Sequence, residues 1–263
     1  MSDLMTTGLR AYTILLAFLL GSVFASFITC VAYRTVKGES WIRGRSHCDV
    51  CGHELEKWDL VPIVSYAALH GRCRYCGAKI PGDSTVAEIT LGLAWVGLVL
   101  RFGLSLATVE FMGLATLLLG LSVADFMSYE IPDGFIFSGL IWYAATLAAG
   151  GIFKKVPVGR LFIDGIIGAV AIAGGLLVIS LIFDKITGKE SLGGGDIKLF
   201  FMLGWYLGWK KGLLNLIVAC LVGLLMAATS RREKIPFGPA ISIASYVTII
   251  LGDPVIHWYL GLF

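Results

Sequence analysis

Long uninterrupted runs of apolar residues alternate with short polar stretches along most of this chain. One run extends from Ala11 to Ala32 and another from Ile166 to Phe183. A bilayer core about 30 Å thick needs about 20 residues of helix, so such runs predict membrane-spanning helices. We expect about eight spans, with approximate boundaries, at 11–33, 86–102, 107–124, 134–152, 161–183, 197–209, 212–229 and 237–252.

Composition indicates the same fold class. Of the 263 residues, 57% are hydrophobic and 15% are charged, whereas a soluble domain carries about 25% charged residues. Glycines recur inside the apolar runs, where small residues let helices pack closely in lipid. The sequence therefore predicts an all-α polytopic membrane protein, and a net charge of only +3 gives no reason to expect a nucleic-acid partner.

The only sizeable polar stretch is segment 34–85, which divides the chain into three parts. These are a first transmembrane helix at 1–33, a loop domain at 34–85 and a transmembrane bundle at 86–263. The first apolar run is longer than the ~7–15 residues of a signal peptide, so we expect it to be retained. Lys and Arg are more numerous on the side of the 34–85 loop, which predicts that this loop faces the cytoplasm.

Four cysteines of the loop form two C-x-x-C pairs, Cys48 with Cys51 and Cys73 with Cys76, each followed by glycine. This spacing suits a tetrahedral zinc ion with four thiolate ligands. A loop of ~50 residues is too small to be stabilised by an apolar core alone, so the zinc is expected to be structural. Two disulfides are the alternative, which a reducing cytoplasm disfavours.

Two aspartates lie at the ends of predicted spans. Asp125 ends the third span, and Asp196 follows three glycines at the start of the sixth. Two spans separate these positions, so both aspartates fall at the same membrane face and can meet. Two close carboxyls cannot both ionise and share one proton. The ionised partner can take a proton from a water that attacks a peptide carbonyl, while the other donates to the carbonyl oxygen.

These residues alone leave other interpretations open. Asp196 could form an ion pair with Lys198 or Arg34, or cap the helix that begins at Ile197. An ion-coupled transporter would use the same aspartates, although it has no need of the cysteine pairs. A zinc protease is a further alternative, but the chain lacks the His-Glu-x-x-His pattern of that class.

Several segments, taken in order, resemble the bacterial type IV prepilin peptidases, which are membrane aspartyl proteases of the G-x-G-D type. The resemblance extends over nearly the whole chain. The segments are Gly21-Ser22, Ser26-Phe27 and Arg34; Ser46 to His53; Leu60 to Tyr66; Gly71 to Gly77; Asp125 with Ile131-Pro132-Asp133; Gly193 to Lys198; and Pro236 to Pro239.

This resemblance implies a bifunctional enzyme of the bacterial inner membrane, with its zinc loop and active site facing the cytoplasm. It implies cleavage of the leader of prepilins or pseudopilins, in a pilus or secretion pathway, and methylation of the new N-terminus with S-adenosylmethionine. Asp125 and Asp196 match the catalytic aspartates, and Asp133 is expected to be a helix cap. Gly71 and Glu88 fall where the family has residues associated with methylation. The oligomeric state is not implied.

Overall fold

The computed structural model describes residues 2–154, 158–188, 192–230 and 234–261. Within these ranges the regular structure is helical, apart from isolated bridges between His47 and Glu54 and between Arg72 and Lys79. Seven of the described helices are long and apolar enough to cross a membrane, which confirms an all-α polytopic membrane protein. Four of the lysines and arginines on which the predicted cytoplasmic orientation of the 34–85 loop is based lie outside the described ranges: Lys155, Lys189, Arg231 and Arg232.

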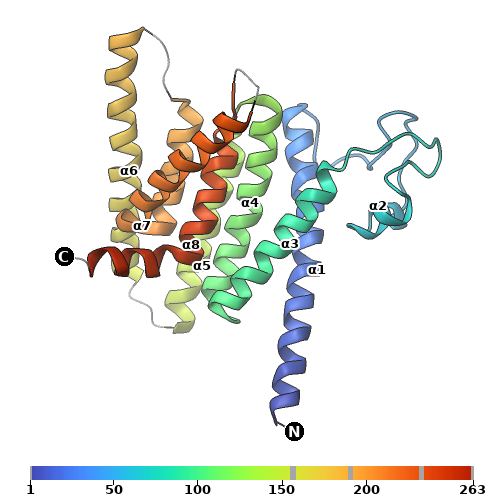
Figure 1. The fold of residues 1–263 in the computed structure, drawn as a ribbon, viewed down its shortest axis with the longest axis horizontal. Helices are drawn as coiled ribbons and strands as arrows, with labels where there is room; N and C mark the ends of the chain where they lie inside the picture. The colour runs from blue at the N-terminus through green and yellow to red at the C-terminus, as the bar shows by residue number, and fades with distance from the viewer. Residues whose placement is uncertain (1, 155–157, 189–191, 231–233, 262–263) are drawn as a thin grey trace. The chain divides into compact units, whose positions relative to one another are not determined.

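The chain forms two compact units, Met1–Leu104 and Ser105–Phe263. Figure 1 labels the helices of both units. Their bounds are α1 (Ser2–Val36), η1 (Lys57–Leu60), α2 (Val64–Ala68), α3 (Asp83–Phe102), α4 (Leu106–Ser128), α5 (Asp133–Lys154), α6 (Val158–Thr187), α7 (Gly194–Thr229) and α8 (Gly238–Leu260).

In the first unit, the antiparallel helices α1 and α3 pack against each other, and the loop between them carries the short helices η1 and α2 (Figure 1). Glycines allow a close approach of the two long helices. A Cβ atom on Gly21 would lie 2.9 Å from the Cα atom of Gly92. In lipid, where helices associate through packing and polar contacts, such small residues permit tight contact.

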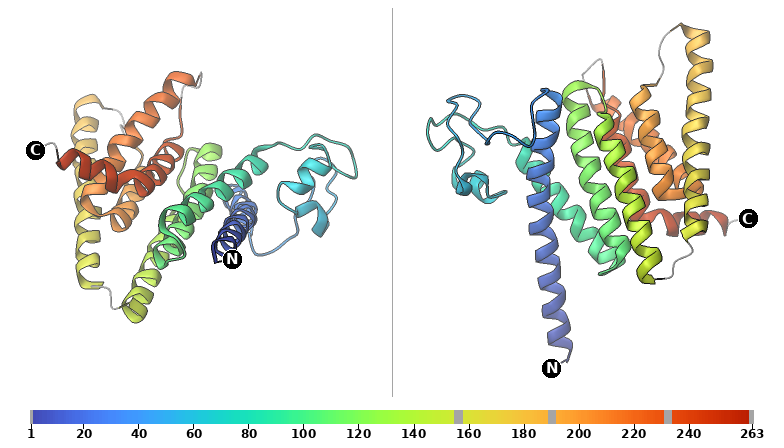
Figure 2. Two further views of the ribbon diagram at one scale, coloured as in Figure 1. Left: turned by 60° about the horizontal axis from the view of Figure 1, so that its bottom comes forward. Right: turned by 180° about the vertical axis from the view of Figure 1, so that it is seen from behind.

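In the second unit, α7 packs against both α6 and α8, and α4 packs against α5 and α8. A Cβ atom on Gly168 of α6 would lie 2.6 Å from the carbonyl oxygen of Gly204 of α7, so these backbones are nearly in contact. The end of α4 and the starts of α7 and α8 lie at the same end of this unit (Figure 2). This arrangement brings distant parts of the sequence together.

The eight predicted spans correspond to seven long helices, because segments 197–209 and 212–229 form the two arms of α7, which meet at a kink. The hydropathy pattern divides this run at Lys210 and Lys211. The helical geometry breaks at Gly208, whose φ is 66° and ψ is −177°, so the two arms are separate helical segments. Glycine adopts such a positive φ without the steric cost that a Cβ would impose.

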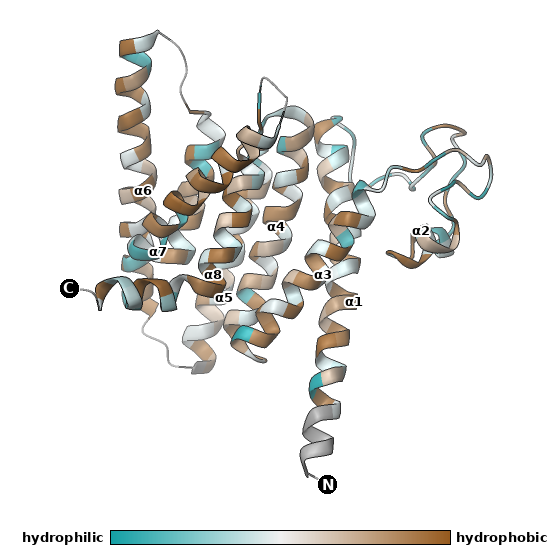
Figure 3. Cartoon of the chain, in the orientation of Figure 1, coloured by the Kyte–Doolittle hydropathy of each residue, from teal (hydrophilic) through white to brown (hydrophobic). Residues whose placement is uncertain are grey.

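Large apolar side chains remain exposed on the long helices, which are predominantly brown in Figure 3. Leu19 of α1, Leu93 of α3, Val170 of α6 and Leu224 of α7 are each more than half exposed. In water such a surface would mark an association site. On helices of this length it is the surface expected to face lipid.

Candidate active site and metal centre

Asp125 lies in the last turn of α4 and is only 5% exposed. Its Oδ2 atom accepts a hydrogen bond of 2.7 Å from the backbone N–H of Gly238, the first residue of α8. Its own backbone carbonyl accepts the N–H of Tyr129, which ends α4 in a left-handed conformation. The carboxylate is therefore fixed between the end of one helix and the start of another.

Asp196 lies in the first turn of α7 and is half-buried. Its backbone N–H donates to the carbonyl of Gly193 at 3.0 Å. Gly195, beside it, packs so closely that an added Cβ atom would lie 3.0 Å from the Cβ atom of Ile131. The charge of Asp125 acts on the Asp196 carboxyl. The structure thus brings the two predicted aspartates within electrostatic range of each other.

The alternative ion pairs of Asp196 are not the ones that form. The Nζ atom of Lys198 lies 2.7 Å from Oδ1 and 3.0 Å from Oδ2 of Asp133, the first residue of α5. The guanidinium of Arg34 donates to three backbone carbonyls of the loop that follows it. Both cations that could have paired with Asp196 therefore have other partners.

One functional contact was missed by sequence reasoning. The segment Pro236 to Pro239 was recognised only as part of the resemblance, and no role followed from it. The structure shows why a glycine stands there, since a Cβ atom on Gly238 would lie 2.7 Å from Oδ2 of Asp125. Below this contact, the hydroxyls of Ser122 and Ser242 are 2.8 Å apart and join α4 to α8. A glycine at the first position of a helix was the available signal.

The four cysteines of the two C-x-x-C pairs meet in the first unit. Their sulfur atoms all lie within 4.8 Å of one another, and those of Cys48 and Cys76 are 3.9 Å apart. Tetrahedral zinc with Zn–S bonds of about 2.3 Å separates its sulfurs by about 3.8 Å. In each knuckle the backbone N–H of the following glycine donates to the carbonyl of the first cysteine. The residues present therefore fit a tetrahedral metal ion.

The thiols of this cluster differ in acidity. Hydrogen bonds from the backbone N–H groups of Cys51 and Val50 lower the pKa of Cys48 to about 7. The backbone N–H of Ala78 favours the Cys76 thiolate, but desolvation and the neighbouring thiols raise the pKa of Cys76 to about 11. Because metal ligation requires thiolates, loading of the cluster releases protons.

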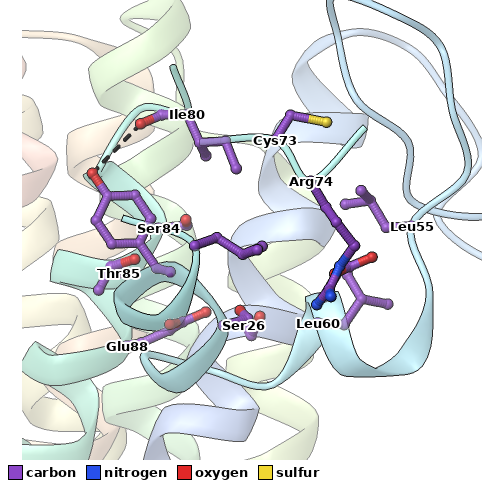
Figure 4. Close-up of a pocket in the computed structure, with 13 residues that line it drawn as sticks. Ser26, Leu55, Leu60, Cys73, Arg74, Ile80, Ser84, Thr85 and Glu88 are labelled. Atoms are coloured by element: carbon purple, nitrogen blue, oxygen red, sulfur yellow. Dashed lines mark hydrogen bonds and ion pairs between the residues drawn. The ribbon is translucent and has the colours of Figure 1, made fainter. Parts of the chain in front are cut away.

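Glu88 lines a cavity of about 170 Å³ in the first unit (Figure 4), and Gly71 lies next to Tyr66, another lining residue. Glu88 of α3 is buried, and its Oε2 atom accepts the N–H of Ile63 at 2.8 Å. Gly71 has a φ of +67°, and a Cβ atom on it would lie 2.9 Å from the hydroxyl oxygen of Tyr66. The lining residues are Ser26, Leu55, Asp59, Leu60, Ser65, Tyr66, Leu69, Cys73, Arg74, Ile80, Ser84, Thr85 and Glu88. Glu88 thus borders the cavity directly, and Gly71 borders it through Tyr66.

Comparison with known proteins covers both units. Residues 19–102 match the model of the bacterial peptidase A24 N-terminal domain, and residues 111–228 match that of the type IV leader peptidase family. No solved structure matches.

Among similar proteins are three that carry the name prepilin leader peptidase/N-methyltransferase. That of Pseudomonas putida is 29% identical, with 93% of each chain covered. That of Stutzerimonas stutzeri is 31% identical over 82% of this chain and 74% of the relative. That of Aeromonas hydrophila is 31% identical over 83% and 76%. This chain therefore belongs to the type IV leader peptidase family.

Proposed function

We propose that this chain cleaves the leader peptide of prepilins or pseudopilins, with Asp125 and Asp196 as its catalytic pair. This proposal rests on one observation: the two carboxyls, at the end of α4 and the start of α7, come within electrostatic range at one end of a membrane bundle. Family membership supports the same reaction. The chain would act in the bacterial inner membrane, with the 34–85 loop and the aspartates facing the cytoplasm.

The surroundings of the two aspartates suggest different roles for them. Asp125 accepts the Gly238 N–H at the start of α8, and the positive end of a helix dipole favours a negative charge. Asp125 is then the ionised partner, and Asp196 holds the shared proton. Asp125 takes a proton from the attacking water, and Asp196 donates one to the carbonyl oxygen. The tetrahedral intermediate then collapses: one of its hydroxyls returns a proton to Asp196 as the carbonyl re-forms, the C–N bond breaks, and the leaving amine takes up the proton held by Asp125.

The test is cleavage of a synthetic prepilin by the purified chain in liposomes without any ion gradient. We expect one cut at the junction between leader and apolar helix. Gradient-dependent ion uptake without cleavage would instead support the transporter interpretation, which family membership does not support.

Gly238→Ala is expected to slow cleavage by about ten-fold to 100-fold, because displacement of a catalytic group by about 1 Å has effects of that size. The new methyl group would lie 2.7 Å from Oδ2 and 3.2 Å from Cγ of Asp125. Gly194→Ala is the matched control, since no atom lies within 4 Å of a Cβ placed there. The measurement is the initial rate at which each variant cleaves the same peptide. Equal rates for both variants would contradict the role of Gly238.

We further propose that the first unit, which combines helix 1–33 and the loop domain 34–85 with α3 from the predicted bundle 86–263, methylates the new N-terminus. The buried carboxylate of Glu88 suits a cationic sulfonium donor such as S-adenosylmethionine, which would supply the methyl group. The cavity of about 170 Å³ is smaller than the ~300–1,000 Å³ usual for ligand pockets, so it would enclose only part of that cofactor. Zinc held by Cys48, Cys51, Cys73 and Cys76 would stabilise the loop.

Gly71→Val is expected to leave cleavage intact and to abolish methylation. A side chain at position 71 would strain the positive φ and strike the ring of Tyr66 beside the cavity. Gly44→Val is the control, because Gly44 also has a positive φ, +96°, but no atom lies within 4 Å of its Cβ position. Mass spectrometry of the processed pilin measures both leader cleavage and N-terminal methylation. Fully methylated product from Gly71→Val would show that this turn has no part in methyl transfer.

A further inference from the structure

The exposed side of helices η1 and α2 carries five apolar residues, next to the exposed Lys57. Trp58 is 76% exposed, Leu60 45% and Val64 62%, and Ala67 and Ala68 are also exposed. We call these five residues the outer face. The inward side carries Ser65, Tyr66 and Leu69, which line the cavity beside Glu88, and Leu60 also lines this cavity although it is 45% exposed. A helix on a water-facing surface has the opposite arrangement, with polar residues outside and apolar residues inside.

The same segment contacts both spans, although it belongs to the loop. Leu60 and Ser65 share the cavity with Ser26 of α1 (Figure 4), and the N–H of Ile63 donates to Glu88 of α3 at 2.8 Å. Ser26 lies seven residues before the end of the predicted span 11–33, and Glu88 two residues after the start of the predicted span 86–102. At 1.5 Å per residue these positions are about 10 Å and about 3 Å inside the span ends.

The residues next to Ser26 and Glu88 are apolar and exposed, which indicates that lipid surrounds this part of both spans. Phe27, next to Ser26, is 54% exposed, and Ile89, next to Glu88, is 39% exposed. Each headgroup region of a bilayer is only about 5–8 Å thick. A segment that contacts the spans this far from their ends therefore lies near the boundary between headgroups and acyl chains. The outer face continues an apolar surface that the long helices already present to lipid.

Two further features match an interfacial segment. Trp58 follows an exposed lysine, Lys57, and tryptophan and lysine are favoured where a protein meets headgroups. The segment is also fixed to the second cysteine knuckle, because the guanidinium of Arg74 donates to Asp59 of η1 at 2.8 Å. Burial opposes ionisation of Asp59, but this hydrogen bond and the backbone N–H of Glu56 keep its pKa below the usual value.

We propose that helices η1 and α2 form an interfacial membrane anchor whose outer face inserts into the lipid leaflet next to the 34–85 loop. The anchor holds the cysteine cluster against the bilayer and places the Glu88 cavity at the membrane surface. This inference depends on the exposure and depth of the segment and not on the proposed peptidase reaction.

Photocrosslinking of the full chain in liposomes of phosphatidylethanolamine and phosphatidylglycerol tests the anchor. The photoreactive residue p-benzoylphenylalanine replaces Trp58 or Val64, one at a time. The positive control is Leu19, which is 52% exposed on α1. The matched negative control is Val50, which has the same side chain as Val64, is 73% exposed, and lies in the first cysteine knuckle. Zinc content of each protein reports whether the loop is folded.

We expect lipid adducts at positions 58 and 64 in yields close to that at 19 and several-fold above that at 50, as measured by mass spectrometry. Yields at 58 and 64 as low as at 50 would overturn the proposal. A crosslink between two copies of the chain at position 64 would also overturn it, because the outer face would then be a protein interface. Lipid adducts in a protein that cleaves no prepilin would support the anchor and refute only the peptidase function.

Discussion

Replacing either Asp125 or Asp196 with asparagine is expected to reduce prepilin cleavage by about 10³-fold or more, because the members of a catalytic unit fail together when one is removed. An amide cannot exchange the proton that the pair shares. Asparagine is nearly the same size as aspartate, so membrane insertion and folding should not change. The measurement is the initial rate of leader removal by each purified variant in liposomes.

Asp133→Asn is the matched control for these two variants. Asp133 is also an aspartate at the start of a helix, but its side chain is 53% exposed and it is paired with Lys198. Loss of an exposed ion pair costs only about 0–1 kcal/mol, so this variant should cleave at nearly the rate of the unaltered protein. Near-normal cleavage by Asp125→Asn or Asp196→Asn would contradict the assignment of the catalytic pair.

The double variant Cys48→Ser, Cys51→Ser is expected to lose its metal and to unfold the 34–85 loop. The unaltered protein should contain about one equivalent of zinc per chain. Structural zinc contributes about 10–16 kcal/mol to the folding of zinc-finger peptides, so a loop this small should not remain folded without it. Elemental analysis measures the zinc, and limited trypsin digestion at the loop's lysines and arginines measures its folding.

Cys220→Ser is the control for the cysteine variants, since Cys220 is exposed on α7 and lies in the second compact unit. It should retain zinc and resist trypsin in the loop. An unaltered protein that contains no zinc yet keeps a trypsin-resistant loop would contradict the structural metal. Loss of the loop should also release the segment from Trp58 to Val64, because Arg74 of the second knuckle is bonded to Asp59.

Features that depend on local sequence were predictable. In lipid, the backbone N–H and C=O groups of an apolar run of about 20 residues can form hydrogen bonds only with one another, so the run forms a helix. The C-x-x-C knuckles likewise form within a few residues, because each glycine N–H bonds back to the first cysteine of its own knuckle. The meeting of Asp125 and Asp196 was also within reach, since two spans between them return the chain to the same face.

Only the tertiary structure decided the contacts between distant segments. Hydropathy divides the chain at Lys210 and Lys211, and the structure places the kink between the two arms of α7 at Gly208. No local pattern indicates that the N–H of Gly238 meets Asp125, 113 residues earlier. Nor does one indicate that the N–H of Ile63 meets Glu88, 25 residues later. A hydropathy pattern records how much a residue favours lipid, whereas these contacts depend on which helix faces pack together, and that is set by the shapes of several helices at once.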